Sequence, residues 1–236
     1  EQKPGDPYTI YAASGSGFYK STDFRATWEL KLSGIAHRIA LGVTAANAQK
    51  VVMFTSLNSA FHHLYVSNNS GESFTLVNST GIVNERQGGY NLDVIIDPLN
   101  ENIMYAGMVN FYKSVNGGVT WVEQTPVYAD DQHTFEFHPV THRLFIGNDS
   151  GIWITDNGTS YTRSSNGLNI SEPYRIDVAA QNPNHWIIGS QDASTFVTNG
   201  GPFYNSIGAD GMTCRFDPTD ANYVYGSSQY GFIARS

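Results

Sequence analysis

One turn sequence occurs four times along this 236-residue chain, at a nearly constant interval. Each copy begins with Ser or Thr, carries Asp or Asn two residues later, and closes on an aromatic residue. The closing aromatics lie 46, 47 and 40 residues apart. A period of this length in a strand-rich chain is typical of a β-propeller, in which each repeat forms one blade. The copies are Ser21–Trp28, Ser67–Phe74, Ser114–Trp121 and Thr155–Tyr161.

The residue types of this repeated turn suit a structural role. An Asp or Asn side chain can accept hydrogen bonds from backbone N–H groups further along the turn. A glycine in the fifth position adopts the positive φ that such a turn needs, so Arg25 at that place predicts a strained or differently wound first copy. We expect both tryptophans of the set to be largely buried. The structural residues assigned on this basis are Asp23, Trp28, Asn69, Phe74, Asn116 and Trp121.

A second repeat, of proline turns, divides the chain into alternating strands. Proline presets a turn and cannot donate to a central strand ladder, so Pro98, Pro139, Pro183 and Pro218 mark strand connections. We therefore predict an all-β propeller of four-stranded antiparallel blades, without helices. The first unit lacks an innermost strand and the last stops before its turn, which predicts either a fragment of a larger propeller or completion by partner residues. The six predicted blades cover about residues 8–34, 37–80, 91–126, 132–166, 174–206 and 211–236 of one propeller domain, 1–236.

Composition excludes several classes of protein. The net charge is −8, whereas a nucleic-acid-binding surface needs clustered Lys and Arg. No run of 18 apolar residues occurs, so we expect no membrane span. Cys214 is the single cysteine, so an intrachain disulfide cannot form.

Polar residues cluster where chain segments enter or leave the predicted innermost strands. Propeller sites usually lie at the central funnel that these strands line, so we predict that the polar side chains converge there and bind a ligand. The alternative is that they cap loop N–H groups where inner strands begin. The candidates are Asp131, His133, Asp149, Gln191, Asp192 and Asp210.

The repeated turn resembles the Asp-box, also called the bacterial neuraminidase (BNR) repeat, of sialidases, sortilin-type receptors and two-propeller xyloglucanases. The order of the motifs Asp130–His133, Asn148–Gly151, Gln191–Ala193 and Gly208–Gly211 resembles a family of secreted bacterial proteins with sortilin- or xyloglucanase-like propellers. This resemblance covers about residues 105–236 and implies an extracellular or cell-surface location. The sequence departs from the family pattern at Ser150, Ala193 and Ala209.

Three roles are compatible with these features, one of them a purely structural segment of a larger secreted adhesin. The leading hypothesis is a secreted, non-catalytic propeller module that recognises a polysaccharide or a cell-surface protein. A further expected partner is the remainder of its own longer chain. The alternative is a glycoside hydrolase of the xyloglucanase-like two-propeller type with its other half missing, which would need a facing carboxylate pair. The catalytic residues of such an enzyme stay unknown.

We expect no cofactor and no transition-metal site, because His133 and His138 lie five apart on one strand and so face opposite sides. We interpret His62 and His63 as an exposed loop pair. Calcium held by Asp149 or Asp210 stays open as an alternative, because such loops offer hard oxygen ligands.

Overall fold

The computed structural model describes the chain except residues 16, 36–37, 84, 125–130, 169–171 and 236. The chain divides into two compact units, Glu1–Asn166 and Gly167–Ser236, and each is described by itself. The described residues form β-strands and one short 3-10 turn, η1 (Gln229–Gly231). None of them forms a helix long and apolar enough to cross a membrane. The all-β prediction is therefore confirmed.

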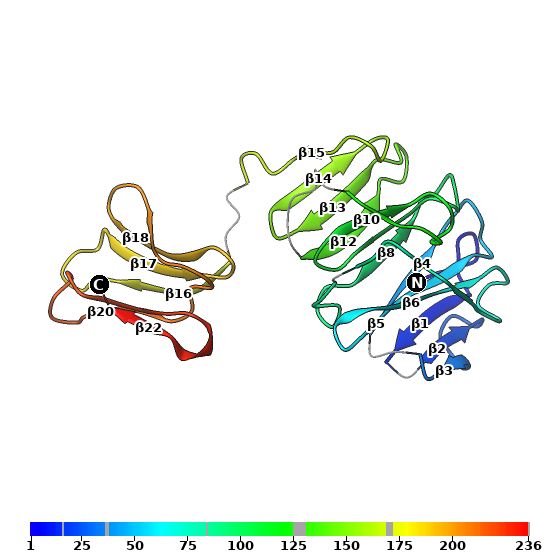
Figure 1. Ribbon diagram of the computed structural model, residues 1–236, viewed down its shortest axis with the longest axis horizontal. Coiled ribbons are helices and arrows are strands. Elements are labelled where there is room, and N and C mark those ends of the chain that lie inside the picture. Colours follow the sequence, from blue (N-terminus) through cyan, green and yellow to red (C-terminus); the bar gives the residue numbers. More distant parts are fainter. Residues whose placement is uncertain (16, 36–37, 84, 125–130, 169–171, 236) are drawn as a thin grey trace. The chain divides into compact units, whose positions relative to one another are not determined.

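Unit 1 holds four antiparallel sheets, here called blades 1 to 4 (Figure 1). In each, the strand order follows the chain. Blade 1 has three strands and blades 2 to 4 have four. The strands are β1 (Ile10–Ser14), β2 (Gly17–Ser21) and β3 (Glu29–Ser33); β4 (Arg38–Val43), β5 (Val51–Leu57), β6 (Ala60–Ser67) and β7 (Thr75–Val77); β8 (Asp93–Ile96), β9 (Met104–Gly107), β10 (Phe111–Ser114) and β11 (Val122–Glu123); β12 (Gln132–Phe137), β13 (Leu144–Asn148), β14 (Gly151–Thr155) and β15 (Thr162–Arg163).

Unit 2 holds blades 5 and 6, which have four and three strands. The first strand of blade 5 lies against the first strand of blade 6. The strands are β16 (Pro173–Val178), β17 (His185–Ser190), β18 (Ser194–Asn199) and β19 (Tyr204–Ile207); β20 (Cys214–Phe216), β21 (Val224–Ser227) and β22 (Ile233–Arg235).

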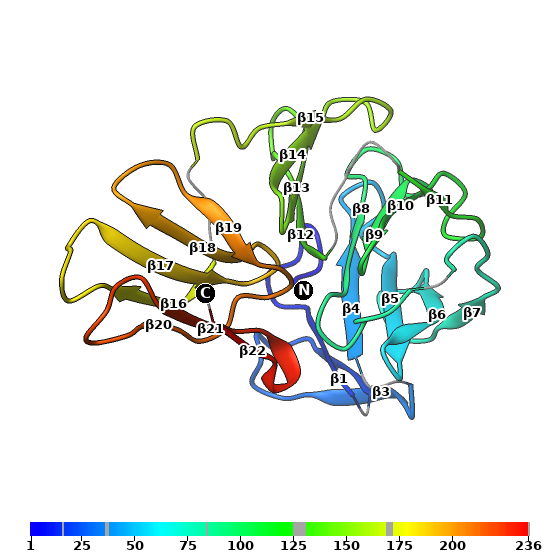
Figure 2. The ribbon, with the colours of Figure 1, turned by 60° about the vertical axis from the view of Figure 1, so that its left-hand side comes forward.

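The blades of unit 1 lie side by side through their first strands. Strand β1 contacts β4, β4 contacts β8, and β8 contacts β12, as Figure 2 shows. The expected gap before β1 is partly filled, since Gln2 forms an antiparallel bridge with Ile10. This stacking of antiparallel sheets along their innermost strands is the propeller arrangement that the repeats predict.

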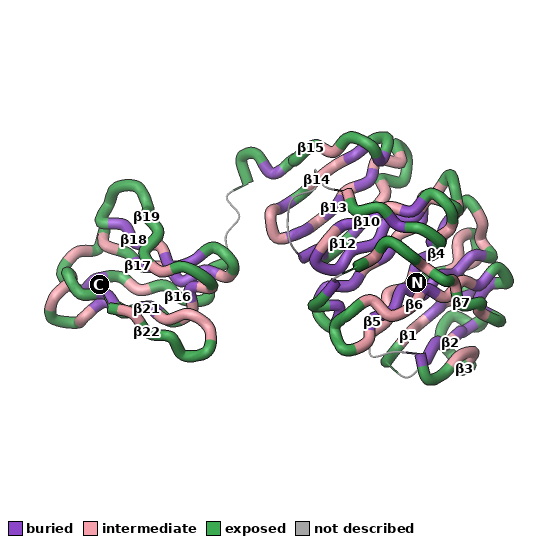
Figure 3. Tube along the Cα trace, viewed as in Figure 1, coloured by how far each residue is buried: buried purple, intermediate pink, exposed green. Residues whose placement is uncertain are grey.

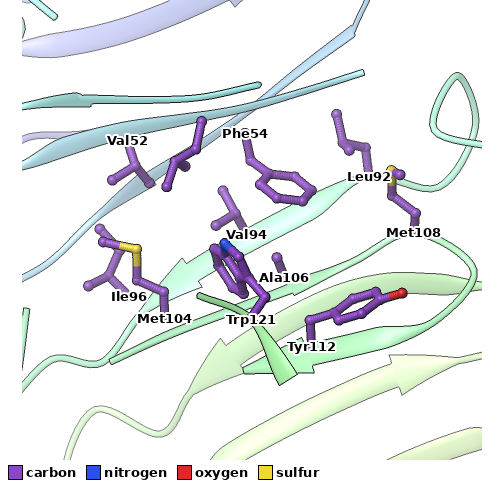
Figure 4. Packing of buried hydrophobic residues seen from close by; sticks show 11 residues of the cluster. Val52, Phe54, Leu92, Val94, Ile96, Met104, Ala106, Met108, Tyr112 and Trp121 are labelled. Atoms are coloured by element: carbon purple, nitrogen blue, oxygen red, sulfur yellow. The ribbon is translucent and has the colours of Figure 1, made fainter. Parts of the chain in front are cut away.

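Apolar side chains gather between neighbouring blades rather than within one sheet. The cluster between blades 2 and 3 combines Phe54 with Val94, Met104 and Trp121, all buried (Figure 4). Similar clusters lie between blades 1 and 2, between blades 3 and 4, and between blades 5 and 6. Figure 3 shows the buried residues of unit 1 along its central strands. Hydrophobic burial therefore joins neighbouring blades within each unit.

The closing aromatics of the second, third and fourth repeated turns each pack on an aromatic ring of the preceding blade. The ring centroids of Trp121 and Phe54 lie 5.8 Å apart, and those of Phe74 and Phe18 lie 4.7 Å apart. Tyr161 meets Phe111 edge-on at 5.8 Å. These separations fall within the range of favourable aromatic pairs.

The predicted burial of Trp28 is wrong, whereas that of Trp121 is confirmed. Trp28 is 42% exposed and Trp121 is 3% exposed. The difference has a physical reason, because Trp28 closes the turn of blade 1 and no described blade precedes it. A closing aromatic is buried by its neighbour and not by its own sheet.

Hydrogen bonds within the repeated turn repeat from copy to copy. In the third copy, Thr120 N–H donates to Asn116 Oδ1 at 2.9 Å, and Gly118 N–H donates to Ser114 Oγ at 2.9 Å. In the first copy, Thr27 N–H donates to Asp23 Oδ1 at 2.9 Å. The hydroxyl and amide of Thr27 lower the pKa of Asp23 to about 2, because they favour the charged carboxylate.

Arg25 adopts the same backbone conformation as the glycines that replace it in other copies. Its φ is 75°, compared with 77° for Gly71 and 88° for Gly118. A side chain in this left-handed region is strained. Of the two alternatives for the first turn, the strained one is therefore correct.

Carboxylates on inner strands also connect neighbouring blades. Asp93 Oδ2 accepts a hydrogen bond from Phe135 N–H of the next inner strand at 2.8 Å. In unit 2, Asp177 Oδ2 accepts one from Phe216 N–H at 2.9 Å. Burial raises the pKa of Asp93 to about 6, although the hydrogen bonds from Phe135 and Val94 oppose this rise.

The exposure difference between the two tryptophans predicts unequal effects of truncation. Trp121→Ala should lower the free energy of unfolding by about 3–5 kcal/mol, because it opens a cavity between blades 2 and 3. Trp28→Ala, the matched control, should cost less than about 1 kcal/mol. Urea denaturation followed by circular dichroism measures both. Equal losses in the two variants would contradict the inter-blade role of Trp121.

Asp93 predicts a pH dependence of stability. The pKa of Asp93 is about 6 in the folded protein and 3.8 as a free group. Between these two pH values, the carboxyl is therefore mostly protonated in the folded state and mostly ionised in the unfolded state. Its contribution is therefore present below pH 4 and is lost as pH rises through 6, by up to about 3 kcal/mol.

Asp93→Asn removes this titration and keeps the side chain's size. The difference in unfolding free energy, wild type minus Asp93→Asn, should fall as pH rises from 4 to 7. Effects of all other titrating groups cancel in this difference. A difference that stays constant over that range would show that the buried carboxyl does not titrate there.

Candidate functional site

All six candidate residues lie at the same end of their own blades. In an antiparallel blade, the loop that enters the first strand and the turn between the second and third strands share one end. The repeated turns and the proline turns lie at the other end. Asp131 lies directly before β12, and His133 lies within it. Asp149 lies in the β13–β14 turn, and Gln191 and Asp192 lie in the β17–β18 turn. Asp210 lies before β20.

In unit 1, His133 and Asp149 form a close pair. His133 Nε2 lies 2.6 Å from Asp149 Oδ1, and both side chains are partly exposed. The Tyr90 ring meets the His133 ring edge-on, with centroids 5.9 Å apart. Tyr90 is itself 64% exposed. An aromatic ring, an imidazole and a carboxylate are thus open to solvent together.

Asp131 lies beside this pair but is buried. Gln87 Nε2 donates to its Oδ1 at 3.0 Å, and its backbone N–H donates to Val109 O at 3.1 Å. Its φ is 66°, which turns the chain sharply into β12. One carboxylate oxygen of Asp131 lies within 4.8 Å of one of Asp149. We call Gln87, Tyr90, Asp131, His133 and Asp149 the unit 1 cluster.

The loop that carries Gln87 and Tyr90 is held by hydrogen bonds to neighbouring segments. Gly88 N–H donates to Ser59 O at 2.9 Å, and Ser56 Oγ donates to Gly88 O at 2.6 Å. A Cβ on Gly88 would come within 2.7 Å of the Ser56 Cβ, so this close approach requires glycine. The Arg38 guanidinium donates to Gly89 O at 3.0 Å.

Sequence reasoning missed Gln87 and Tyr90. The segment Gln87–Tyr90 precedes the inner strand β8, as Asp131 precedes the inner strand β12. Its two glycines between polar and aromatic side chains were the available signal. A search of every loop that enters an inner strand would have included it.

In unit 2, the candidates form a hydrogen-bonded loop support. Asp210 Oδ1 accepts the backbone N–H of Asp192 at 2.7 Å, and the Gln229 amide donates to Asp210 Oδ2. The Tyr174 hydroxyl donates to Gln191 Oε1 at 2.5 Å. The geometry of Asp210 therefore matches the loop-capping alternative rather than an open ligand site.

The structure thus brings the six candidates together as two groups of three. Asp131, His133 and Asp149 lie close together in unit 1. Asp210 joins Asp192 directly in unit 2, and Gln191 is the neighbour of Asp192 along the chain. Convergence of all six on one funnel stays a prediction.

No family model and no curated protein sequence matches the chain. Solved structures do resemble it. A GH74 enzyme of Niastella koreensis has a TM-score of 0.57 at 18% identity, with 97% of this chain and 40% of that chain covered. A GH74 xyloglucanase of Xanthomonas campestris has a TM-score of 0.55 at 14% identity, with 100% and 43% covered. YCF48 bound to D1 peptide has a TM-score of 0.51 at 10% identity, with 98% and 76% covered.

These likenesses define the class of the fold. At such low sequence identity, these likenesses support the β-propeller fold and say nothing about the activity of this chain. The chain spans about 40% of the length of the first of these GH74 enzymes. Together with the blade stacking, they show that the chain is built of β-propeller blades.

The capping role of Asp210 predicts a local loss of stability. Asp210→Ala leaves the Asp192 N–H and the Gln229 amide without this acceptor, which should cost about 1–3 kcal/mol. Amide hydrogen exchange should accelerate in the β17–β18 turn. Asp210→Asn, which keeps one acceptor oxygen, should show a smaller effect. Unchanged exchange in Asp210→Ala would argue that this carboxylate does not support the turn.

Proposed function

We propose that the chain is part of a larger, secreted, non-catalytic β-propeller protein that recognises a glycan or protein at the cell surface. The ligand lies at the unit 1 cluster. The observation that carries this proposal is the exposed Tyr90 ring beside the His133–Asp149 pair. The secreted location rests on the resemblance of the repeated turns to those of extracellular propellers.

The chemistry of the cluster suits a polyhydroxylated ligand. The exposed ring of Tyr90 offers an apolar surface on which a sugar ring can stack, with a polar hydroxyl at its edge. Asp149 offers carboxylate oxygens that accept hydrogen bonds from sugar hydroxyl groups, and His133 orients it. The net charge of −8 disfavours an anionic polysaccharide.

A protein ligand is the second form of this proposal. The structure of YCF48 bound to D1 peptide supports this form of the proposal, since that protein is similar in fold to this chain. The exposed Tyr90 and the carboxylate would suit a peptide that carries basic residues.

Glycoside hydrolysis is the alternative function, favoured by one observation. Carboxylate oxygens of Asp131 and Asp149 come within 4.8 Å, near the separation used by retaining glycosidases. Against it, Asp131 is buried and held by Gln87, and Asp149 is held by His133. The GH74 neighbours are enzymes, but their activity does not transfer at this identity.

Calcium binding at Asp149 stays a prediction. The partly exposed carboxylate of Asp149 is accessible to an ion from solvent. Asp210 is the weaker calcium candidate, since both its oxygens accept hydrogen bonds within unit 2. Calorimetry with and without calcium tests this directly.

The binding proposal predicts the loss of glycan affinity in two variants. Isothermal titration with a panel of neutral plant and bacterial polysaccharides should detect binding to the wild type. Tyr90→Ala should weaken it by about 1–3 kcal/mol, because the stacking surface is removed. Asp149→Asn should weaken it by a similar amount. Tyr8→Ala is the matched control, since Tyr8 is also 63% exposed in unit 1 and lies outside the cluster.

The outcomes separate the alternatives. Polysaccharide binding that survives both cluster variants would place the site elsewhere. Release of reducing ends by the wild type, lost in Asp149→Asn, would instead establish the hydrolase. Binding of basic peptides without glycan binding would favour the protein ligand. Absence of binding to the glycan and peptide panels would contradict recognition of those ligands by the cluster.

A further inference from the structure

A β-bulge in β6 turns two consecutive histidines to the same side of blade 2. Thr55 pairs with His63, but Ser56 pairs with Phe61, so His62 is an extra residue in this strand. Bulges of this kind re-aim side chains that strict alternation would send to opposite faces. His62 and His63 therefore do not form the exposed loop pair expected from the sequence, and both lie half-buried within a strand.

The packing of the residues before and after His62 and His63 is consistent with a bulge in β6. Phe61 and Leu64 both contribute to the cluster between blades 2 and 3, although they lie three apart and would alternate in a regular strand. The His63 ring meets the Tyr65 ring edge-on at 5.8 Å. Tyr65 packs against the cluster between blades 1 and 2. The two imidazoles thus occupy the face opposite Phe61.

The two rings approach each other through their nitrogen atoms. His62 Nδ1 and His63 Nδ1 lie 3.1 Å apart, and the ring centroids lie 3.8 Å apart. Without a bridging ion, one nitrogen must donate its hydrogen to the other. A separation near 3 Å is also the spacing of two nitrogens on one metal ion, given metal–nitrogen distances of about 2.0–2.1 Å.

We propose that His62 and His63 form a two-imidazole chelating site for a borderline divalent transition-metal ion, with Cu²⁺ preferred. The bulge brings the two Nδ1 atoms to 3.1 Å before any ion arrives, so the rings need only turn to direct both nitrogens at one ion. Water or an external ligand completes the coordination. This site is distinct from the unit 1 cluster and does not depend on the proposed function.

The ligand chemistry determines the choice of ion. Imidazole nitrogen suits Cu²⁺, Ni²⁺ and Zn²⁺, whereas Ca²⁺ and Mg²⁺ require oxygen ligands. Affinity should follow the order of divalent first-row metals, with Cu²⁺ the tightest. Burial, and to a lesser extent His63, lower the pKa of His62.

Electron paramagnetic resonance with Cu²⁺ tests the site on the intact protein. One equivalent of Cu²⁺ is added to the protein at pH 7.5. The electron spin echo envelope modulation should then show two equatorial imidazole ligands on the Cu²⁺ ion. His62→Gln and His63→Gln should each leave one imidazole and weaken the affinity by about a hundredfold or more, because chelation is lost. Zn²⁺ and Ni²⁺ should compete for the site, whereas Ca²⁺ should not.

Controls distinguish the pair from other histidines and from unfolding. His138→Asn removes a histidine from the β12–β13 turn and should leave the two-imidazole spectrum unchanged. Circular dichroism in the absence of metal should show folded His62→Gln and His63→Gln variants. A spectrum with one or no equatorial imidazole in the wild type would overturn the proposal. So would a two-imidazole spectrum that persists in both folded variants.

Discussion

Packing of one blade against the next is the constraint on which the rest of this structure depends. The blades of unit 1 lie side by side through their first strands. Their apolar residues gather between sheets, where Trp121 meets Phe54 and Tyr161 meets Phe111. A blade therefore has a complete core only when its neighbour is present. The exposed Trp28 follows from the same rule.

This constraint also explains where polar function can reside. The faces of the blades are used for packing, and one end carries the repeated turns and proline turns that hold the strands in register. The opposite end carries the loops that enter inner strands and the turns between second and third strands. The unit 1 cluster forms there because Arg38, Ser56 and Ser59 hold the Gln87–Tyr90 loop beside the start of β12.

The sequence predicts the fold well because repetition multiplies a weak local signal. One Ser-x-Asn turn says little, but copies ending at Phe74 and Trp121 fix blade length and strand order together. The burial of Trp28 could not be predicted, since it depends on a neighbour and not on the turn itself. The His62–His63 pair was misjudged because a bulge leaves no clear mark in the alternation of side chains.

The candidate site could be predicted in part. Loop position predicts that Asp131, His133 and Asp149 lie at one end of the blades, where inner strands begin. Loop position could not distinguish a carboxylate that is open to a ligand from one that accepts loop N–H groups. Asp210 is of the second kind, since it accepts the backbone N–H of Asp192. Tyr90 was missed because its proximity to His133 depends on contacts between loops distant in sequence.

A double-mutant cycle on Phe54 and Trp121 tests the central claim most directly. The claim is that the closing aromatic of a turn stabilises the protein through the ring of the preceding blade. Unfolding free energies of Phe54→Leu, Trp121→Leu and the double variant should reveal a favourable coupling of about 0.5–1.5 kcal/mol. Additive effects of the two substitutions would contradict the account.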